Sequence, residues 1–315
     1  MARYLVTGGA GFIGSHIVEE LLKRGEEVRI IDNLSTGKID NIKDFLSEVE
    51  FLEADLRDIN KVREAVEGVD YVLHQAAIPS VPRSIADPIS SNSANVDGTL
   101  NLLFAAKEAK IKRVVIASSS SVYGDSQILP KSEEFTPNPI SPYAVTKLVE
   151  ELYALVFYRI YGLETVSLRY FNVFGPRQDP TSQYAAVIPR FITKMLKGES
   201  PVIFGDGKQS RDFTYVKNVV EANLLASISD KVGHGEVINI ACGESITLNQ
   251  LVDRINEILG TDIKPIYTEP RPGDVRHSLA SINKAKELLG YTVKVSFLDG
   301  LKETINWYKN NKDVE

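Results

Sequence analysis

The chain has 315 residues, of which 43% are hydrophobic and 25% charged, and its formal net charge is -6. This length can bury one large core or two closely packed ones, and the composition is that of an ordinary globular protein. The acidic balance weighs against nucleic-acid and membrane-surface partners, which a basic face would favour. A single cysteine excludes an internal disulfide, and neither a secretion signal nor a transmembrane stretch is present, so we expect a cytoplasmic protein.

Apolar runs and helical patterns alternate along the first half of the chain. Strands are expected at residues 4–6, 28–32, 51–56, 71–77, 113–118 and 164–171. Helices are expected at residues 13–24, 96–109 and 142–160. This alternation is typical of a doubly wound parallel sheet with helices on both faces, the Rossmann arrangement.

The second half is less regular. It predicts a loop at 176–185, helices at 187–197 and 248–259, a turn at 204–207, and one further parallel strand at 237–241. That strand would return the chain to the first domain. We therefore expect an α/β protein with a Rossmann domain at 1–172 and about 214–242, and a smaller C-terminal α/β domain at about 173–213 and 243–315.

A glycine-rich segment follows the first expected strand and opens the first helix. Gly8, Gly11 and Gly14 have the spacing that permits a tight turn, close approach of a pyrophosphate, and close packing of helix on strand. Asp32 ends the next strand, where a carboxylate accepts hydrogen bonds from an adenosine ribose. That carboxylate would repel a 2′-phosphate, and the nearest cation is Lys38, so the pattern favours NAD over NADP.

Tyr143 and Lys147 are four residues apart and share one face of the expected helix at 142–160. A nearby ammonium lowers the pKa of a phenol, which would make Tyr143 a base. Such a pair alone is common on solvated helix faces, but a hydride transfer behind a dinucleotide loop needs a proton acceptor. A serine run at 118–121 ends a strand where ligands bind, so Ser119 could bridge a substrate hydroxyl and Tyr143.

These residues form a wider set of motifs. It comprises 7–14, Asp55-Leu56, 74–77, 118–124, Tyr143-x-x-x-Lys147, 169–172, 210–213 and 271–275. The sequence resembles the extended short-chain dehydrogenases/reductases that modify nucleotide sugars, and most of all the family of UDP-glucose and UDP-N-acetylglucosamine 4-epimerases. The likeness runs from Arg3 to about Tyr308.

The resemblance implies three groups of site residues and no metal ligand. The catalytic residues would be Tyr143, Lys147 and Ser119. NAD would be bound by Gly8, Gly11, Phe12, Ile13, Gly14, Asp32, Asn33, Ser35, Thr36, Gly37, Asp55, Leu56, Gln75, Ala76, Ala77, Pro79, Asn95, Ser118, Tyr143, Lys147, Tyr170 and Val173. The UDP-sugar would be bound by Ser80, Arg83, Ser119, Ser120, Tyr143, Asn172, Ala186, Val187, Ile188, Val202, Phe204, Arg211, Arg271, Asp274 and Ser278.

Within that family, the residues favour inversion at C4 of a UDP-hexose. A 4,6-dehydratase of this type carries Asp-Glu at the positions of Ser120 and Ser121, and a decarboxylase of UDP-glucuronate carries a Glu at the latter position, so both are disfavoured. A reductase is not excluded by the motifs. Ser278 is small at a position that limits the sugar, so both acetylated and plain UDP-hexoses are expected, although Pro79 departs from the family pattern. The serine run also occurs in UDP-glucuronate 4-epimerases, so a UDP-glucuronate or UDP-N-acetylglucosaminuronate 4-epimerase is the nearest alternative.

Two non-enzyme classes are weaker. A redox-sensing NAD-binding protein would be expected to lack Tyr143, Lys147 or Ser119, and all three are present. An RNA-binding scaffold disagrees with the acidic charge. The resemblance further implies a homodimer formed by the helices around 100–109 and 145–157, although their apolar faces could equally belong to the core of one chain.

Overall fold

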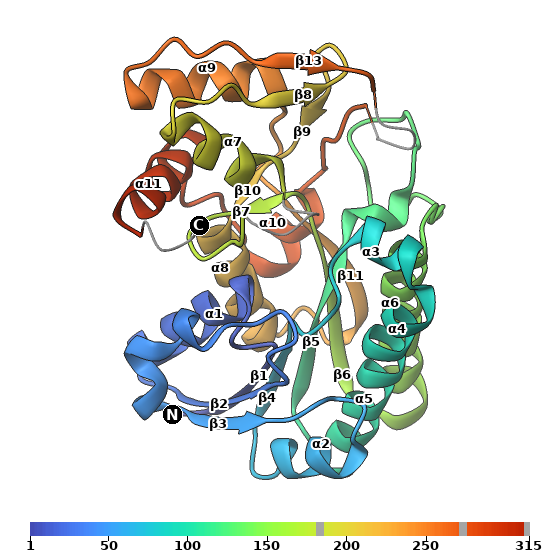
Figure 1. The fold of residues 1–315 in the computed structure, drawn as a ribbon. Coiled ribbons are helices and arrows are strands. Elements are labelled where there is room, and N and C mark those ends of the chain that lie inside the picture. The colour runs from blue at the N-terminus through green and yellow to red at the C-terminus, as the bar shows by residue number, and fades with distance from the viewer. Residues whose placement is uncertain (181–185, 271–275, 312–315) are drawn as a thin grey trace.

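A seven-stranded parallel sheet is the centre of the computed structural model, which describes residues 1–180, 186–270 and 276–311 (Figure 1). The strand order is β11-β6-β5-β4-β1-β2-β3, and every neighbouring pair is parallel. The strands are β1 (Arg3–Thr7), β2 (Glu27–Asp32), β3 (Glu50–Glu53), β4 (Tyr71–His74), β5 (Arg113–Ser119), β6 (Glu164–Tyr170) and β11 (His234–Ile240). The expected α/β fold class, with a strand from the second half returning to the sheet, is confirmed.

The position of β1 inside this sheet determines where a ligand can bind. The chain first builds β2 and β3 on one side of β1, then crosses over to place β4 on the other side. In a doubly wound sheet, such a reversal opens a crevice outside the carboxyl ends of the two central strands. The carboxyl ends of β1 and β4 are therefore the expected floor of a site.

The strands are apolar on both faces because helices cover both faces. Leu5 and Val6 of β1 and the successive residues Val114, Val115 and Ile116 of β5 are all fully buried. A strand with both faces covered needs no polar side, so it appears in the sequence as a continuous apolar run. This explains why the central strands could be located from sequence.

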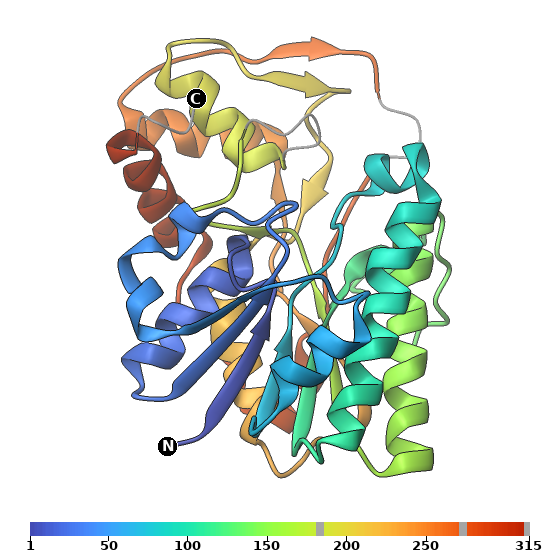
Figure 2. The ribbon, with the colours of Figure 1, turned by 60° about the horizontal axis from the view of Figure 1, so that its bottom comes forward.

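Two helical layers enclose the sheet (Figure 2). One layer contains α2 (Ile59–Val66), α5 (Gly98–Glu108) and α6 (Pro142–Tyr161), which is extended by α3 (Val81–Ala86), α4 (Pro88–Asn92) and the π-helical turn η3 (Ser93–Asp97). The other layer contains α1 (Phe12–Lys23), α8 (Val216–Ile228) and α10 (Asn283–Leu289). Three short 3-10 segments lie in connections: η1 (Ile39–Asn41), η2 (Lys43–Glu48) and η4 (Ser120–Tyr123).

A smaller group of elements lies beyond the β1–α1 loop, at the top of Figure 1. It contains α7 (Val187–Leu196), α9 (Leu248–Leu259), α11 (Phe297–Asn310) and the strand pairs β7 (Val173–Phe174) with β10 (Thr214–Tyr215), β8 (Val202–Phe204) with β13 (Ile266–Thr268), and β9 (Ser210–Arg211) with β12 (Ile246–Thr247). An aromatic cluster joins these segments: the ring centroids of Phe174, Phe213 and Phe297 lie 5.6–6.3 Å apart. This cluster ties residues from three distant parts of the chain into one core.

The start of α6 is fixed by its own sequence. Ser141 is the N-cap, and its hydroxyl oxygen accepts a hydrogen bond from the backbone N–H of Ala144 at 3.2 Å. Pro142 occupies the first turn, where its missing N–H costs nothing, and Gly162 ends the helix in a left-handed conformation. These caps hold the first turn of α6, which carries Tyr143, in one position.

The structure also differs from the sequence-based expectation. β3 and β4 each end three residues before the predicted ends at 56 and 77. Beyond β3, the carboxylate of Asp55 accepts the backbone N–H of Arg57 at 2.9 Å and turns the chain. Beyond β4, the backbone N–H of Ala76 donates to the Thr7 hydroxyl at 3.2 Å. In both places a backbone N–H bonds to a side-chain oxygen instead of to the neighbouring strand. Strand propensity does not predict such a bond.

Six helices were not predicted: α2, α3, α4, α8, α10 and α11. The reason is clearest for α8, which is enclosed between α1, α10 and the sheet, so that most of its residues are buried and its hydrophobic periodicity is weak. Among the described residues, no helix has both the length and the apolar character needed to cross a bilayer.

Candidate active site

The loop between β1 and α1 has room for backbone but not for side chains. Gly8 has a φ of +67°, and a Cβ there would lie 2.8 Å from the backbone of Ala76. A Cβ on Gly14 would lie 2.1 Å from the carbonyl oxygen of Gly8. Gly11 begins α1 without a side-chain cap, so the first amides of the helix are available to an anion. Gly11, Phe12 and Gly14 all line a cleft at this point.

Two carboxylates lie at the end of this cleft nearest β2 and β3. Asp32 accepts hydrogen bonds from the backbone N–H of Ala10 at 3.0 Å and of Leu34 at 2.8 Å. Burial raises the pKa of Asp32, and these two amides oppose that effect. Hydrogen bonds from Arg57 hold the pKa of Asp55 well below its usual range, so this carboxyl is ionised.

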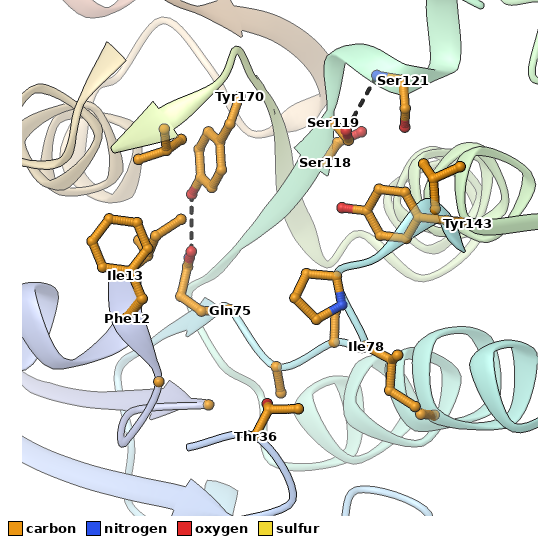
Figure 3. A pocket seen from close by; sticks show the side chains of 18 of the residues that line it. Phe12, Ile13, Thr36, Gln75, Ile78, Ser118, Ser119, Ser121, Tyr143 and Tyr170 are labelled. Carbon is orange, nitrogen blue, oxygen red and sulfur yellow. Dashed lines mark hydrogen bonds between the residues drawn. The ribbon is translucent and has the colours of Figure 1, made fainter. Parts of the chain in front are cut away.

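The cleft runs without interruption from these carboxylates to the smaller group of elements. It has a volume of about 1040 Å³. Figure 3 shows its middle, where Phe12 and Ile13 face Tyr170 and Gln75 on one side and Ser119 and Tyr143 lie on the other. The Tyr170 hydroxyl donates to the side-chain oxygen of Gln75 at 3.1 Å. The cleft follows the carboxyl ends of the central strands, as the strand order requires.

Tyr143 points its hydroxyl into the cleft toward Ser119, the last residue of β5 (Figure 3). Burial raises the pKa of Tyr143, whereas the ammonium of Lys147 and the hydroxyl of Ser119 lower it. The sequence predicted the direction of the Lys147 effect but not the larger, opposing effect of burial.

Lys147 lies one turn further along α6 and is only 3% exposed. Its ammonium donates to the carbonyl oxygen of Ala117 at 2.8 Å and to the Glu150 carboxylate at 2.9 Å. Burial is the largest single effect and lowers the pKa of Lys147, but the charge and hydrogen bond of Glu150, together with the charges of Tyr143 and Glu151, leave the pKa above its ordinary value. Lys147 is therefore a charged ammonium held directly behind the wall of the cleft.

The segment before α3 is held against α6 by polar side chains. Asn95 accepts the backbone N–H of Ile78 at 2.8 Å and donates to the Thr146 hydroxyl at 3.0 Å. Ser84 accepts the backbone N–H of Tyr143 at 3.0 Å. These bonds fix the position of the cleft wall relative to the tyrosine.

The opposite end of the cleft is lined by Asn172, Arg211, His277 and Ser278. The side-chain amide of Asn172 donates to the Asp212 carbonyl oxygen at 3.0 Å and approaches the Ser278 hydroxyl at 3.4 Å. The Arg211 guanidinium donates to backbone carbonyls at 2.9 and 3.2 Å, which orient it at the rim. This end presents a cation and hydroxyl groups, which suits an anionic, oxygen-rich ligand.

The sequence profile of the NAD-dependent epimerase/dehydratase family matches residues 4–241. The chain belongs to this family. A relative from Methanocaldococcus jannaschii, provisionally named a UDP-glucose 4-epimerase, is 44% identical over 98% of both chains.

Solved structures of epimerases share the fold over almost the whole chain. The UDP-N-acetylglucosamine 4-epimerase of Methanobrevibacter ruminantium, in complex with UDP-N-acetylmuramic acid, is 46% identical with a TM-score of 0.94, covering 98% of this chain and 99% of that one. The UDP-glucose 4-epimerase of Thermus thermophilus, in complex with NAD, is 39% identical with a TM-score of 0.88 and the same coverage. NAD is thus the cofactor of the family to which this chain belongs.

Most residues expected to bind ligands in this epimerase-family chain do line the cleft. On the cofactor side they are Gly8, Gly11, Phe12, Ile13, Gly14, Asp32, Asn33, Ser35, Thr36, Asp55, Leu56, Gln75, Ala76, Ala77, Pro79, Ser118, Tyr143, Tyr170 and Val173. On the substrate side they are Ser119, Ser120, Tyr143, Asn172, Arg211 and Ser278. The structure therefore brings together residues from nearly every predicted motif.

Other predicted residues are not part of that lining. Gly37 packs against Asp32, Asn95 and Lys147 lie behind the wall, and Ser80 caps α3. The remaining ones are Arg83, Ala186, Val187, Ile188, Val202 and Phe204, of which Ile188 is in the core. Arg271 and Asp274 lie outside the described residues. The ligand roles of all these residues stay predictions.

Several lining residues were not predicted. His277 adjoins the predicted Ser278, and its ring nitrogen Nδ1 is 2.9 Å from the Ser210 hydroxyl, so the motif around Ser278 was a usable signal. Lys131 and Ile140 come from the irregular segment between η4 and α6, where no local pattern marks a site. Only the folded chain brings them to the cleft.

Proposed function

We propose that the protein inverts C4 of UDP-hexoses, interconverting UDP-GlcNAc with UDP-GalNAc and UDP-glucose with UDP-galactose, with NAD retained between turnovers. The observation that carries this proposal is one continuous cleft that contains a dinucleotide cradle, a tyrosine facing a serine, and a cationic far end. The family and the epimerases described above support the same reaction class.

The residues present fit NAD. The glycine loop leaves only backbone beside the amides that begin α1, and a side chain on Gly8 or Gly14 would fill this cradle. Asp32 at the end of β2 can accept ribose hydroxyls and would repel a 2′-phosphate. When bound, NAD supplies a reversible acceptor for the hydride on C4 of the sugar.

The chain itself supplies proton transfer and orientation. Tyr143, as a phenolate, would accept the proton of the 4-hydroxyl, directly or through Ser119, and would return it after the 4-keto sugar has turned. The ammonium of Lys147 stabilises that phenolate through its charge. Inversion requires a firm hold on the diphosphate and a loose hold on the hexose, since both faces of C4 must meet the same acceptor.

The residues that line the cleft do not suit a dehydratase, which eliminates water from the sugar. Among the described residues that line it, the carboxylates are Asp32 and Asp55, and both lie at the adenosine end. Beside Tyr143 the strand end offers the hydroxyls of Ser119, Ser120 and Ser121 instead. A dehydratase needs a separate acid and base at the sugar, so this arrangement favours epimerisation.

The far end of the cleft is assigned to the UDP moiety. Arg211 would neutralise the diphosphate and Asn172 would bind it or the sugar; Arg271 and Asp274, predicted for the diphosphate and the uridine ribose, lie outside the described residues. The small Ser278 leaves room for a 2-acetamido group. Pro79 also lines the cleft, and there it would shape the sugar pocket.

The direct test uses purified protein incubated separately with UDP-GlcNAc, UDP-glucose and UDP-glucuronate, with and without added NAD. Proton NMR resolves the C4 epimers. We expect conversion of the first two sugars without net consumption of NAD, and loss of conversion in Tyr143→Phe. Conversion of UDP-glucuronate alone would replace the proposal by its nearest alternative, and conversion that consumes stoichiometric cofactor would indicate a dehydrogenase.

We further infer a homodimer, formed through α5 and α6. Exposed apolar side chains form a stripe along α6 at Val145, Leu152 and Val156, which are 42–54% exposed, and Phe104 of α5 is 39% exposed. A second copy of the same surface would cover this stripe.

We assign NAD binding to residues 1–172 and about 214–242, and UDP-sugar binding to about 173–213 and 243–315. We assign the protein to the cytoplasm.

A further inference from the structure

Glu150 is an acid inside the protein that the proposed reaction does not use. It lies on α6, one turn beyond Lys147, and is 1% exposed. One carboxylate oxygen, Oε2, accepts the Lys147 ammonium at 2.9 Å, whereas Oε1 is buried with no hydrogen-bond partner among the described residues. A buried carboxylate oxygen without a partner costs stability, so a functional role would explain why Glu150 stands here.

The other charges around Glu150 are accounted for. Glu151, also on α6, is paired with Arg169 of β6 at 2.7 and 2.8 Å, so its charge is largely neutralised. His74 of β4 faces Lys147, and burial lowers the pKa of this imidazole to about 3, so it is neutral. From η3 and α5, the side chains that reach this region are the uncharged Asn95 and Thr99.

One ammonium therefore faces two groups that can carry a negative charge. Glu150 and Tyr143 lie on opposite sides of Lys147 along the same helix, at positions +3 and −4. Lys147 lowers the pKa of Tyr143 and the charge of Glu150 raises it. When Glu150 is ionised, it offsets part of the charge of the ammonium, so the phenol loses its proton at a higher pH.

We propose that Glu150 is a positioning residue that competes with the Tyr143 phenolate for the charge of Lys147 and thereby sets the pH at which the enzyme becomes active. The inference rests on the proposed role of Tyr143 as the base. Burial raises the pKa of Glu150 to about 7, so its ionisation falls in the physiological range. The Lys147 ammonium has three N–H bonds. The carbonyl oxygen of Ala117 and the carboxylate of Glu150 accept two of them, which fixes the direction of the third N–H bond.

The test is Glu150→Gln, which keeps the shape and removes the charge. We expect the acid limb of the kcat profile to move to lower pH by about one unit, because Lys147 then acts on the phenol alone. KM should change little, since Glu150 is not among the described residues lining the cleft. Glu150→Ala should shift the limb in the same direction, and Glu150→Asp should return it toward the wild-type position.

The matched control is Glu64→Gln. Glu64 pairs with Lys61 at 2.8 Å with the same i,i+3 spacing, but on the exposed surface of α2, so its removal should leave the profile unchanged. A readout independent of turnover is the ultraviolet titration of the phenolate, taken as the difference between each protein and its Tyr143→Phe counterpart. We expect Tyr143 to ionise at lower pH in Glu150→Gln.

Two outcomes would overturn the inference. One is an acid limb and a phenolate titration that coincide in wild type, Glu150→Gln and Glu150→Ala. The other is a rate that falls by the same factor at every pH, which would indicate a structural role only. Tyr143→Phe separates a failure of this inference from a failure of the proposed function. If Tyr143→Phe stays active, the proposed base is wrong. If Tyr143→Phe is inactive while the acid limb does not move in the Glu150 variants, only the role of Glu150 fails.

Discussion

Gly14→Ala should damage the cofactor cradle more than it damages the fold. The added Cβ would lie 2.1 Å from the Gly8 carbonyl oxygen and 2.9 Å from the Gly9 Cα, and both neighbours are backbone. Gly8 cannot move away easily, because its N–H donates to the Ile31 carbonyl at 2.9 Å and its carbonyl accepts Gly11 at 3.0 Å. The turn would have to open by about 1 Å, which for such overpacking costs about 1–3 kcal/mol.

For a chain of this length that cost corresponds to a fall in Tm of roughly 1.5–5 °C, measured by calorimetry. NAD affinity, measured by titration calorimetry, should fall at least about tenfold, because the amides that begin α1 no longer converge on the pyrophosphate. The control is Gly290→Ala. Gly290 has a φ of +64°, and a Cβ added there would have no atom within 4 Å. The alanine variant would therefore carry backbone strain of about 1 kcal/mol at a site away from the cleft. A Gly14→Ala protein with wild-type NAD affinity would refute this account of the cradle.

Three further predictions address other parts of the molecule. Ser278→Tyr should abolish turnover of UDP-GlcNAc but not of UDP-glucose in the NMR assay; equal loss of both would remove Ser278 as the determinant of sugar size. His74 binds its proton only below a pKa of about 3 when folded, whereas the unfolded chain binds one below about 6.5. As the pH is lowered from 6.5 to 5, His74 therefore reduces the free energy of unfolding by about 2 kcal/mol. Urea unfolding of His74→Asn should show a smaller loss of stability toward acid pH than the wild type, and an equal loss would contradict this. Leu152→Glu with Val156→Glu should give a monomer in light scattering, and a dimer in that variant would rule out the α6 interface.

The parts of the structure that could be predicted from sequence share a physical basis. The strands β1, β2, β5 and β6 are buried on both faces and appear as apolar runs, and the glycine loop has a spacing that backbone geometry demands. Tyr143 and Lys147 were predicted as neighbours because helical spacing fixes them on one face. Such features depend on local chemistry that a short segment contains in full.

Other parts depend on tertiary contacts and could not be predicted. Helix α8 is enclosed from several sides and has no distinct polar face, so its pattern was not recognised. Lys131 is held beside the cleft by long-range contacts, such as the hydrogen bond from its backbone N–H to the carbonyl oxygen of Leu279. The buried pair of Lys147 and Glu150 could have been noticed from its i,i+3 spacing, but its burial depends on the packing of α6 against β5, β6 and α5.

The most direct test of the central claim follows the hydrogen on C4. The protein is incubated with UDP-N-acetylglucosamine carrying deuterium at C4, and the product is analysed by NMR and mass spectrometry. The account predicts inversion at C4 with the deuterium retained in the product sugar, because the same NAD accepts and returns it. Loss of deuterium to solvent, entry of solvent hydrogen at C5, or the absence of inversion would contradict it.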